Sequence, residues 1–185
     1  MRKGEKLLTR ADWARAALDA IGKGGIAAVR VDRLAPELGA TRGSFYWHFE
    51  DRRDLLTAAL DMWERDGITD VETALAALDD PTARLRAIFA TAFSHPETAN
   101  IEAALTTHAD DALVAPVLKR ITAARLTLLR KIFGELGFDP SESEQRARIF
   151  HVSYLGHFQA RRATPTAYRD TDYLDTLLHL LTRSA

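Results

Sequence analysis

The feature that most constrains the fold is the stretch from Val31 to Leu56, which reads VDRLAPELGATRGSFYWHFEDRRDLL. It predicts two short helices, over residues 31–38 and 42–48, that are separated at Gly39, because glycine easily takes the left-handed conformation that ends a helix. A longer helix is expected to follow. Two short helices around a tight turn are the arrangement of a helix-turn-helix, whose second helix can lie in the major groove of DNA.

The second of these helices has an unusual outer face. Phe45 and Phe49 are four residues apart and are expected to anchor the segment inward. The other side chains offer hydrogen-bond donors, aromatic faces and one glycine rather than the Lys, Glu and Gln of an ordinary solvated helix, and a DNA-reading surface uses such groups. Because aromatic residues are usually at least partly buried, an alternative in which Tyr46 and Trp47 pack on a neighbouring helix stays open. The outward set is Arg42, Gly43, Ser44, Tyr46, Trp47 and His48.

The net charge of −1 hides an asymmetry along the chain. Residues 1–53 contain 11 Lys and Arg against 7 Asp and Glu, whereas the remaining residues contain 14 against 19. A basic head on an acidic body is typical of a protein whose head meets a polyanion, although a chance fluctuation in charge would give the same numbers.

Beyond the head the chain shows helical periodicity and no strand-like alternation, so we expect an all-α protein of about nine helices. An apolar stripe that begins at Leu55 predicts one long helix over residues 52–79. Ser141 with Glu144 predicts a capping box ahead of a helix over residues 142–161. The other helices are expected from Thr9 to about Lys23, from Pro81 to the His95–Pro96 pair, and over residues 98–108, 111–136 and 171–183.

Composition excludes several classes of protein. The chain has no cysteine, which rules out disulfides and thiolate metal sites and fits a reducing, cytoplasmic compartment. The longest uncharged runs, such as residues 149–160, are shorter than the roughly 18 apolar residues of a membrane span. The basic N-terminus has no apolar segment behind it, so we expect no signal peptide.

No motif of a catalytic site is present. The chain lacks a HExxH zinc motif, a GxSxG nucleophile elbow and a glycine-rich phosphate loop. His151 and His157 are six residues apart and diverge on a helix, so they do not form a metal site. We therefore expect no enzyme, no metal and no cofactor. The alternative to a DNA-binding protein is a helical protein-interaction adaptor, which would leave the aromatic outer face without a role.

The run LAPELGATRGSFYWHFEDRRDLL strongly resembles the helix-turn-helix of TetR-type (tetracycline-repressor-like) transcriptional regulators, over about residues 9–60. The resemblance implies a ligand-responsive repressor that binds a palindromic double-stranded DNA operator as a homodimer. It implies a helix-turn-helix DNA-binding domain in residues 1–51 and a helical ligand-binding and dimerisation domain in residues 52–185.

The resemblance also assigns roles to residues of the head. Positions that approach bases are Arg42, Gly43, Ser44 and Trp47, and positions that contact phosphate or line the groove are Thr41, Tyr46, His48 and Arg52. Apart from the family pattern, we expect Arg33 to contact phosphate as well. The chain departs from the family pattern at Arg30, where a small hydroxyl residue often caps the second helix, and at Arg52, where Lys is common. Asp32 stands where some members carry a basic reader, which argues against a base contact from that position.

The body is expected to hold the small-molecule pocket between the fourth and eighth helices. Aromatic and histidine side chains there would suit an apolar or aromatic effector, although the alternative that most of them are plain core stays open. The candidate lining consists of Trp63, Phe89, Phe93, His108 and Tyr154.

The eighth helix is apolar on two sides, which predicts that one side packs on its own body and the other on a second subunit. The alternative is a single wide core face in a monomer. The candidate dimer interface consists of Val152, Gly156, Ala160, Leu174 and Leu178.

Overall fold

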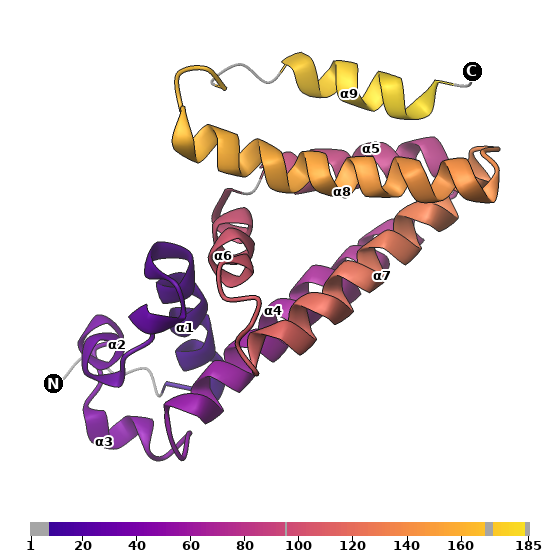
Figure 1. Cartoon of the computed structure of the whole chain (residues 1–185). Coiled ribbons are helices and arrows are strands. Elements are labelled where there is room, and N and C mark those ends of the chain that lie inside the picture. The colour runs from indigo at the N-terminus through magenta and orange to yellow at the C-terminus, as the bar shows by residue number, and fades with distance from the viewer. Residues whose placement is uncertain (1–7, 95, 169–171, 184–185) are drawn as a thin grey trace, which may run out of the picture.

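The structure is a computed structural model that describes residues 8–94, 96–168 and 172–183. Over these residues it contains nine α-helices, one short 3₁₀ helix and no strand, as the sequence predicts (Figure 1). No helix in this part of the chain is both long and apolar enough to cross a membrane. The elements are α1 (Arg10–Gly24), η1 (Ile26–Ala28), α2 (Val31–Glu37), α3 (Arg42–Phe45), α4 (Arg52–Ala76), α5 (Pro81–Ser94), α6 (Pro96–Thr106), α7 (Val114–Glu135), α8 (Pro140–Ala163) and α9 (Asp172–Thr182).

The head is formed by α1, α2, α3 and the first turns of α4, which gather at one end of the molecule (Figure 1). The first helix begins with a capping box, as predicted, because Thr9 Oγ1 accepts from the backbone N–H of Asp12 at 3.2 Å and the Asp12 carboxylate accepts from Thr9 N–H at 2.8 Å. Trp13 packs edge-on against Phe45 with 5.4 Å between ring centroids. Together with the buried Phe49, these rings tie α1 to the turn after α3.

The helix predicted over residues 42–48 is α-helical only from Arg42 to Phe45. The chain then continues in tight turns, in which Trp47 N–H bonds to Ser44 O at 3.3 Å and His48 N–H to Phe45 O at 2.9 Å. Three-residue spacing of these bonds marks a tightened last turn, which is common at helix ends. The segment therefore keeps its predicted direction and inward anchors while its second half is wound more tightly.

One long helix, α4, leads from the head into the body (Figure 1). It packs closely against α7, because a Cβ on Gly67 would lie only 2.9 Å from Ile121 Cδ1. Arg120 of α7 also donates to both carboxylate oxygens of Glu64, at 2.7 and 2.6 Å. Movement of α4 along its axis is thus coupled to α7.

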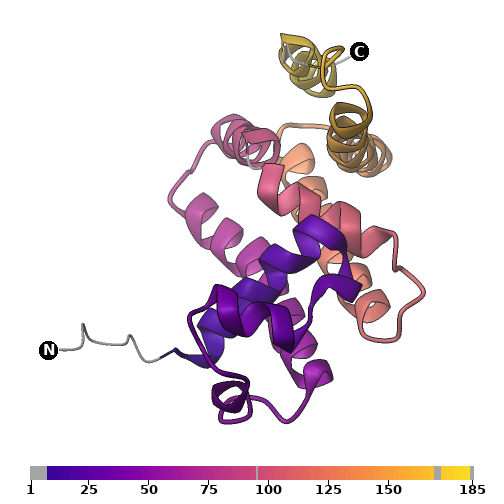
Figure 2. The ribbon, with the colours of Figure 1, turned by 90° about the vertical axis from the view of Figure 1, so that its left-hand side faces the viewer.

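A second core joins α5, α7, α8 and α9 in the body. The eighth helix begins at Pro140 rather than after Ser141, because Asp139 accepts from Glu142 N–H at 2.9 Å and proline suits the first helical position. α9 lies along the outer side of α8 (Figures 1 and 2). Arg146 holds its C-terminal end by donating to the carbonyls of Leu181 and Arg183, at 2.8 and 3.0 Å. Residues 169–171, which include the predicted start of the ninth helix, lie outside the described residues.

Candidate functional site

Two aromatic side chains stand out on the surface of the head. Trp47 is 88% exposed and Tyr46 is 59% exposed, so the alternative in which both are buried against a neighbouring helix is wrong. Tyr46 rests on the edge of the buried Phe45 ring, with 5.1 Å between centroids, and this contact orients its ring. Trp47 projects from the turn after α3 without such support. Two neighbouring exposed rings, one with a hydroxyl and one with an indole N–H, offer stacking faces and hydrogen-bonding groups to a binding partner.

The first turn of α3 presents small and polar groups beside these rings. Thr41 caps the helix, since its hydroxyl accepts from Ser44 N–H at 3.2 Å. Arg42 and Gly43 are exposed, and a Cβ on Gly43 would meet only Thr41 Oγ1, at 3.6 Å. The chain itself therefore leaves room for a side chain at position 43. Glycine there keeps the backbone open to an external molecule.

Arg52, expected to contact phosphate, already bonds within the chain. Its Nε donates to Val29 O at 2.7 Å and its Nη2 donates to Ile26 O. These bonds fasten η1 to the start of α4. The guanidinium keeps its Nη1 group for a further acceptor, whereas Arg33, another predicted phosphate contact, is exposed on α2.

Two further arginines form ion pairs within the head that could not be predicted from the sequence. Arg10 lies 4.2 Å above the Phe49 ring, donates to His48 O and pairs with Asp54 at 2.5 Å, and this hydrogen bond lowers the pKa of the Asp54 carboxyl. Arg30 forms a two-point pair with Asp32, at 3.2 and 2.9 Å, and its hydrogen bond lowers the pKa of Asp32. Arg30 thus gives α2 no side-chain cap, as expected for an arginine. Instead it neutralises Asp32, the acid that departs from the family pattern.

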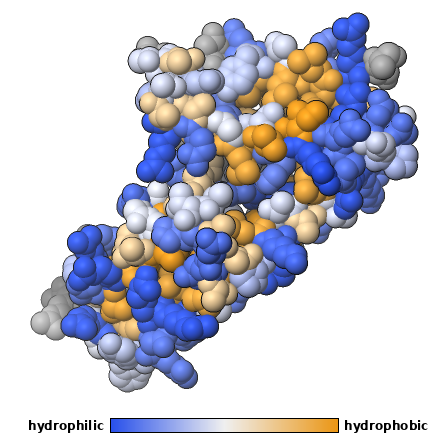
Figure 3. Space-filling model, in the orientation of Figure 1, coloured by the Kyte–Doolittle hydropathy of each residue, from blue (hydrophilic) through white to orange (hydrophobic). Residues whose placement is uncertain are grey.

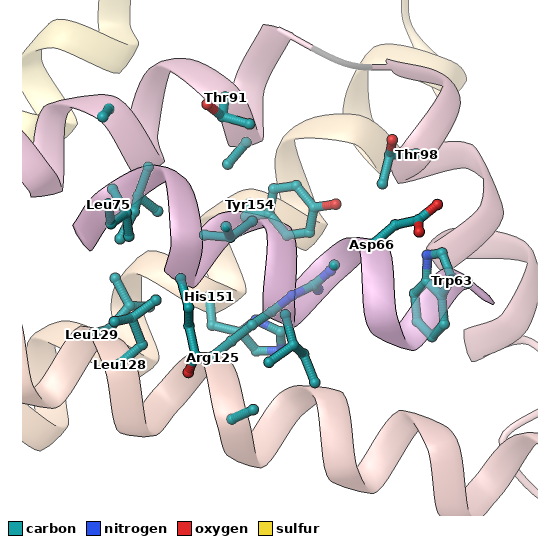
Figure 4. Close-up of a pocket in the computed structure, with 18 of the residues that line it drawn as sticks. Trp63, Asp66, Leu75, Thr91, Thr98, Arg125, Leu128, Leu129, His151 and Tyr154 are labelled. Carbon is teal, nitrogen blue, oxygen red and sulfur yellow. The ribbon is translucent and has the colours of Figure 1, made fainter. Parts of the chain in front are cut away.

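The body contains a cavity of about 430 Å³ that six helices line (Figure 4). Most of its wall is apolar, and its residues come from α1 as well as from the body. Trp63 and Tyr154 were expected in this lining and are found there. Other residues of the lining are Arg15, Leu18, Asp66, Glu72, Leu75, Ile88, Thr98, Arg125, Leu128, Leu129, Phe150 and His151.

Three of the residues expected in the pocket lie elsewhere. Phe89 and Phe93 are buried behind the wall, where they pack against Phe150 with centroids 5.6 and 6.0 Å apart. His108 follows α6 and faces Gly25, and its Nδ1 lies 3.0 Å from Ala104 O. The periodicity placed the two phenylalanines on an inward face correctly, but it could not indicate which side of that face borders the cavity.

A buried carboxylate links three helices beside the cavity. Glu102 of α6 is 2% exposed and accepts hydrogen bonds from Arg125 of α7, at 2.8 and 2.6 Å, and from the Tyr154 hydroxyl of α8, at 3.1 Å. Burial, together with the nearby Glu102 charge, raises the pKa of Tyr154 well above its ordinary value. In the sequence, the one sign of this ion pair was a single acidic residue, Glu102, within an otherwise apolar run. A buried charge requires a partner, so such a residue indicates a buried ion pair.

Two further titratable groups lie at the cavity. Arg15 of α1 pairs with Asp66 of α4 at 3.0 Å, which brings a head residue into the lining. Burial lowers the pKa of His151 below its ordinary value, so its imidazole is uncharged at neutral pH. Among the described residues, no group of three or more His, Cys, Asp or Glu side chains is arranged to hold a metal ion.

The expected dimer surface is only partly exposed. On α8, Val152 is 66% exposed, and a Cβ on Gly156 would meet open space, whereas Ala160 is half-buried. On α9, Leu174 is buried and Leu178 half-buried against the protein's own second core. The outward apolar residues of these helices are Ile149, Val152, Tyr173 and Leu180, and the α8–α9 region shows apolar surface in Figure 3.

Comparison with known proteins adds a family match. Residues 14–59 match the model of a family described as bacterial regulatory proteins, tetR family. The HTH-type transcriptional regulator AcrR of Shigella flexneri is 31% identical over 87 residues, which are 46% of this chain and 40% of AcrR. The match thus spans less than half of that relative.

Solved structures extend the likeness to the whole fold. A TetR-family transcriptional regulator from Agrobacterium tumefaciens has a TM-score of 0.80 at 16% identity, covering 94% of this chain and 97% of that one. The transcriptional regulator FadR from Bacillus subtilis, in complex with stearoyl-CoA, has a TM-score of 0.71 at 16% identity, covering 96% and 100%. All three proteins are named as transcriptional regulators.

Proposed function

We propose that this chain, a member of the tetR family of bacterial regulatory proteins through its residues 14–59, is a dimeric transcriptional repressor released from its operator by a small molecule. The observation that carries the DNA-binding part is the exposed Trp47, held on a rigid turn next to Tyr46 and Arg42. An adaptor protein would have no use for this combination. Such a regulator acts in the cytoplasm, where its operator lies.

In the proposed complex α3 and its following turn enter the major groove. Arg42 forks onto guanine O6 and N7, and Trp47 contacts a thymine methyl, while Gly43 and Ser44 allow the backbone to approach the bases. Phosphate contacts come from the surrounding residues and fix the register without reading sequence. These are Arg33, Thr41, Tyr46, His48 and the free Nη1 of Arg52.

Two copies are needed to read a palindrome. The exposed stripe of Ile149, Val152 and Gly156 on α8, extended by Leu180 of α9, is the surface that we assign to the dimer contact. Small and apolar residues along one helix stripe allow close packing against a second copy of the same helix. The two heads would then read half-sites about 34–36 Å apart.

The cavity connects effector binding to the heads. Its lining includes Arg15 and Leu18 of α1 and seven residues of α4, and α4 is fastened to η1 through Arg52. A molecule that binds better when these helices move apart shifts the protein toward a head spacing that fits the operator less well. The stearoyl-CoA complex of FadR, which shares this fold, supports an organic ligand in the body.

The test of this function is protection of DNA by the purified protein. Footprinting on the DNA upstream of its own gene should show a protected palindrome, and Lys131→Ala, on the exposed side of α7, should leave protection unchanged. Trp47→Ala should weaken it. Absence of both specific and low-salt non-specific DNA binding would contradict the proposal and favour the adaptor.

A further inference from the structure

One lining residue of the cavity has a polar group that the chain does not satisfy. Trp63 is only 3% exposed, and its Nε1–H has no acceptor among the described residues. Figure 4 shows the indole nitrogen on the edge of the ring that faces Asp66. Asp66 itself is engaged by Arg15. Buried N–H groups are nearly always paired. Trp13 Nε1 is unpaired as well, but of these two indoles only Trp63 lines the cavity, so its donor is the one that a bound molecule can satisfy.

The charges around this donor are balanced by the chain. Arg15 pairs with Asp66 at 3.0 Å, and Arg125 pairs with Glu102 at 2.6 Å. An anionic ligand would lie against the Asp66 carboxylate, and a cationic one against the Arg15 guanidinium. An uncharged acceptor avoids both costs.

Two uncharged polar side chains also line the cavity. Thr98 contributes a hydroxyl from α6, and His151, which burial keeps uncharged, contributes an imidazole from α8. Most of the remaining wall is apolar, although Glu72 of α4 and Thr91 of α5 also line it. Its main apolar members are Leu75, Ile88, Leu128, Leu129 and Phe150. The cavity therefore combines a mostly apolar wall with a few polar groups, and the Trp63 donor and Arg15 lie at its end near α1.

We propose that the cavity binds an uncharged, largely apolar molecule whose carbonyl oxygen accepts a hydrogen bond from Trp63 Nε1. This inference rests on the proposed effector site and names the chemical class of its ligand. The carbonyl lies between α1 and α4, beside Arg15 and Leu18, so the polar end of the ligand touches the helix that anchors the head. The apolar end fills the space toward Phe150.

Two probes of the same shape test this hydrogen bond. In 2-acetylnaphthalene a ketone oxygen stands where 2-isopropenylnaphthalene has a CH₂ group. Titration calorimetry of the full chain should show the ketone binding about five- to tenfold more tightly, the range expected for one buried hydrogen bond. The anion 2-naphthoate should bind more weakly than the ketone.

The variant Trp63→Phe removes the donor and keeps a ring in the wall. It should lower the affinity for the ketone to that for the alkene, and it should change the affinity for the alkene by less than about twofold. Trp13→Phe is the matched control, because Trp13 is fully buried, has an equally unpaired Nε1 and does not line the cavity. It should leave both affinities unchanged.

A measurement on the unmodified protein covers the case in which Trp63→Phe fails to fold. With the three indole N–H resonances observed by NMR, the Trp63 signal should move downfield with the ketone and not with the alkene. Equal binding of the two probes, or binding of neither, overturns the proposal. Operator binding without any probe is measured in parallel, because its loss would refute the proposed function instead.

Discussion

Arg125 Nη1 lies 2.8 and 2.6 Å from the two carboxylate oxygens of Glu102, which joins α7 to α6 inside the body. α6 packs on α1 of the head, and α7 packs on α4. The pair therefore connects the two helices that support the head from behind. Tyr154 completes it from α8, so three helices meet at one buried carboxylate.

Breaking this pair should destabilise the fold. Arg125→Leu leaves the Glu102 charge buried without its partner, and we expect a loss of about 3 kcal/mol in the free energy of unfolding, measured by urea denaturation. The double variant Glu102→Leu with Arg125→Leu should lose less than Arg125→Leu alone, because it removes both charges. A double variant that is less stable than the single one would contradict this account.

Trp47→Ala should affect DNA binding without affecting stability. The side chain is almost fully exposed, so the free energy of unfolding should change by less than about 0.5 kcal/mol. Affinity for the operator should fall roughly tenfold while affinity for unrelated DNA changes little, as measured by fluorescence anisotropy. An equal loss for both DNAs would make Trp47 a backbone contact rather than a reader.

The two arginines among the predicted phosphate contacts, Arg33 and Arg52, should behave differently when each is replaced by alanine. Arg33→Ala should reduce the slope of log affinity against log salt by about one and leave the melting temperature unchanged. Arg52→Ala should do the same to the slope and also lower stability by about 1–2 kcal/mol, because its bonds to Val29 and Ile26 are lost. If Arg52→Ala lowers stability but leaves the slope unchanged, the residue is purely structural.

A charge on the proposed dimer surface should separate the subunits. Val152→Glu places a carboxylate in the apolar stripe of α8, and sedimentation should then show a monomer and weaker operator binding. Lys131→Glu, a charge change on an exposed part of α7, is the control and should remain dimeric. A dimeric Val152→Glu protein would place the interface on another face.

Stability should depend on pH through the buried histidines. Burial lowers the pKa of both His151 and His157 in the folded protein below 6.5, so the unfolded chain binds more protons once the pH falls through that value. The free energy of unfolding should therefore decrease between about pH 7 and pH 5. His151→Gln should reduce this slope, and an unchanged slope would show that His151 does not contribute.

Features that depend on a few adjacent residues were predictable from sequence. The capping box of Thr9 and Asp12, the break at Gly39 and the burial of Phe45 and Phe49 follow from helix geometry within one or two turns. The start of α8 was placed two residues late, because Asp139 and Ser141 both favour a helix start and Pro140 made Asp139 the cap. Which of two neighbouring residues caps a helix depends on small differences in free energy.

The cavity and its polar groups could not be predicted in the same way. Arg15 and Asp66 are 51 residues apart, and Glu102 and Arg125 are 23 apart, so each pair exists only because particular helices pack together. Periodicity tells which side of a helix faces inward, but not which neighbour it meets. Phe89 was thus expected in the pocket and Leu174 in the dimer surface, whereas both are buried in the second core.

The amino-acid sequence alone was enough for the all-α class and for the helix-turn-helix with its exposed aromatic face, because periodicity, caps and turn residues act over short distances. The packing of α1, α4, α6, α7 and α8 determined where the cavity lies, which charges are paired around it and that the Trp63 N–H in its wall has no acceptor. Hydrogen bonds and ion pairs need side chains within about 3–4 Å, and residues far apart in the chain reach that distance only in the folded protein.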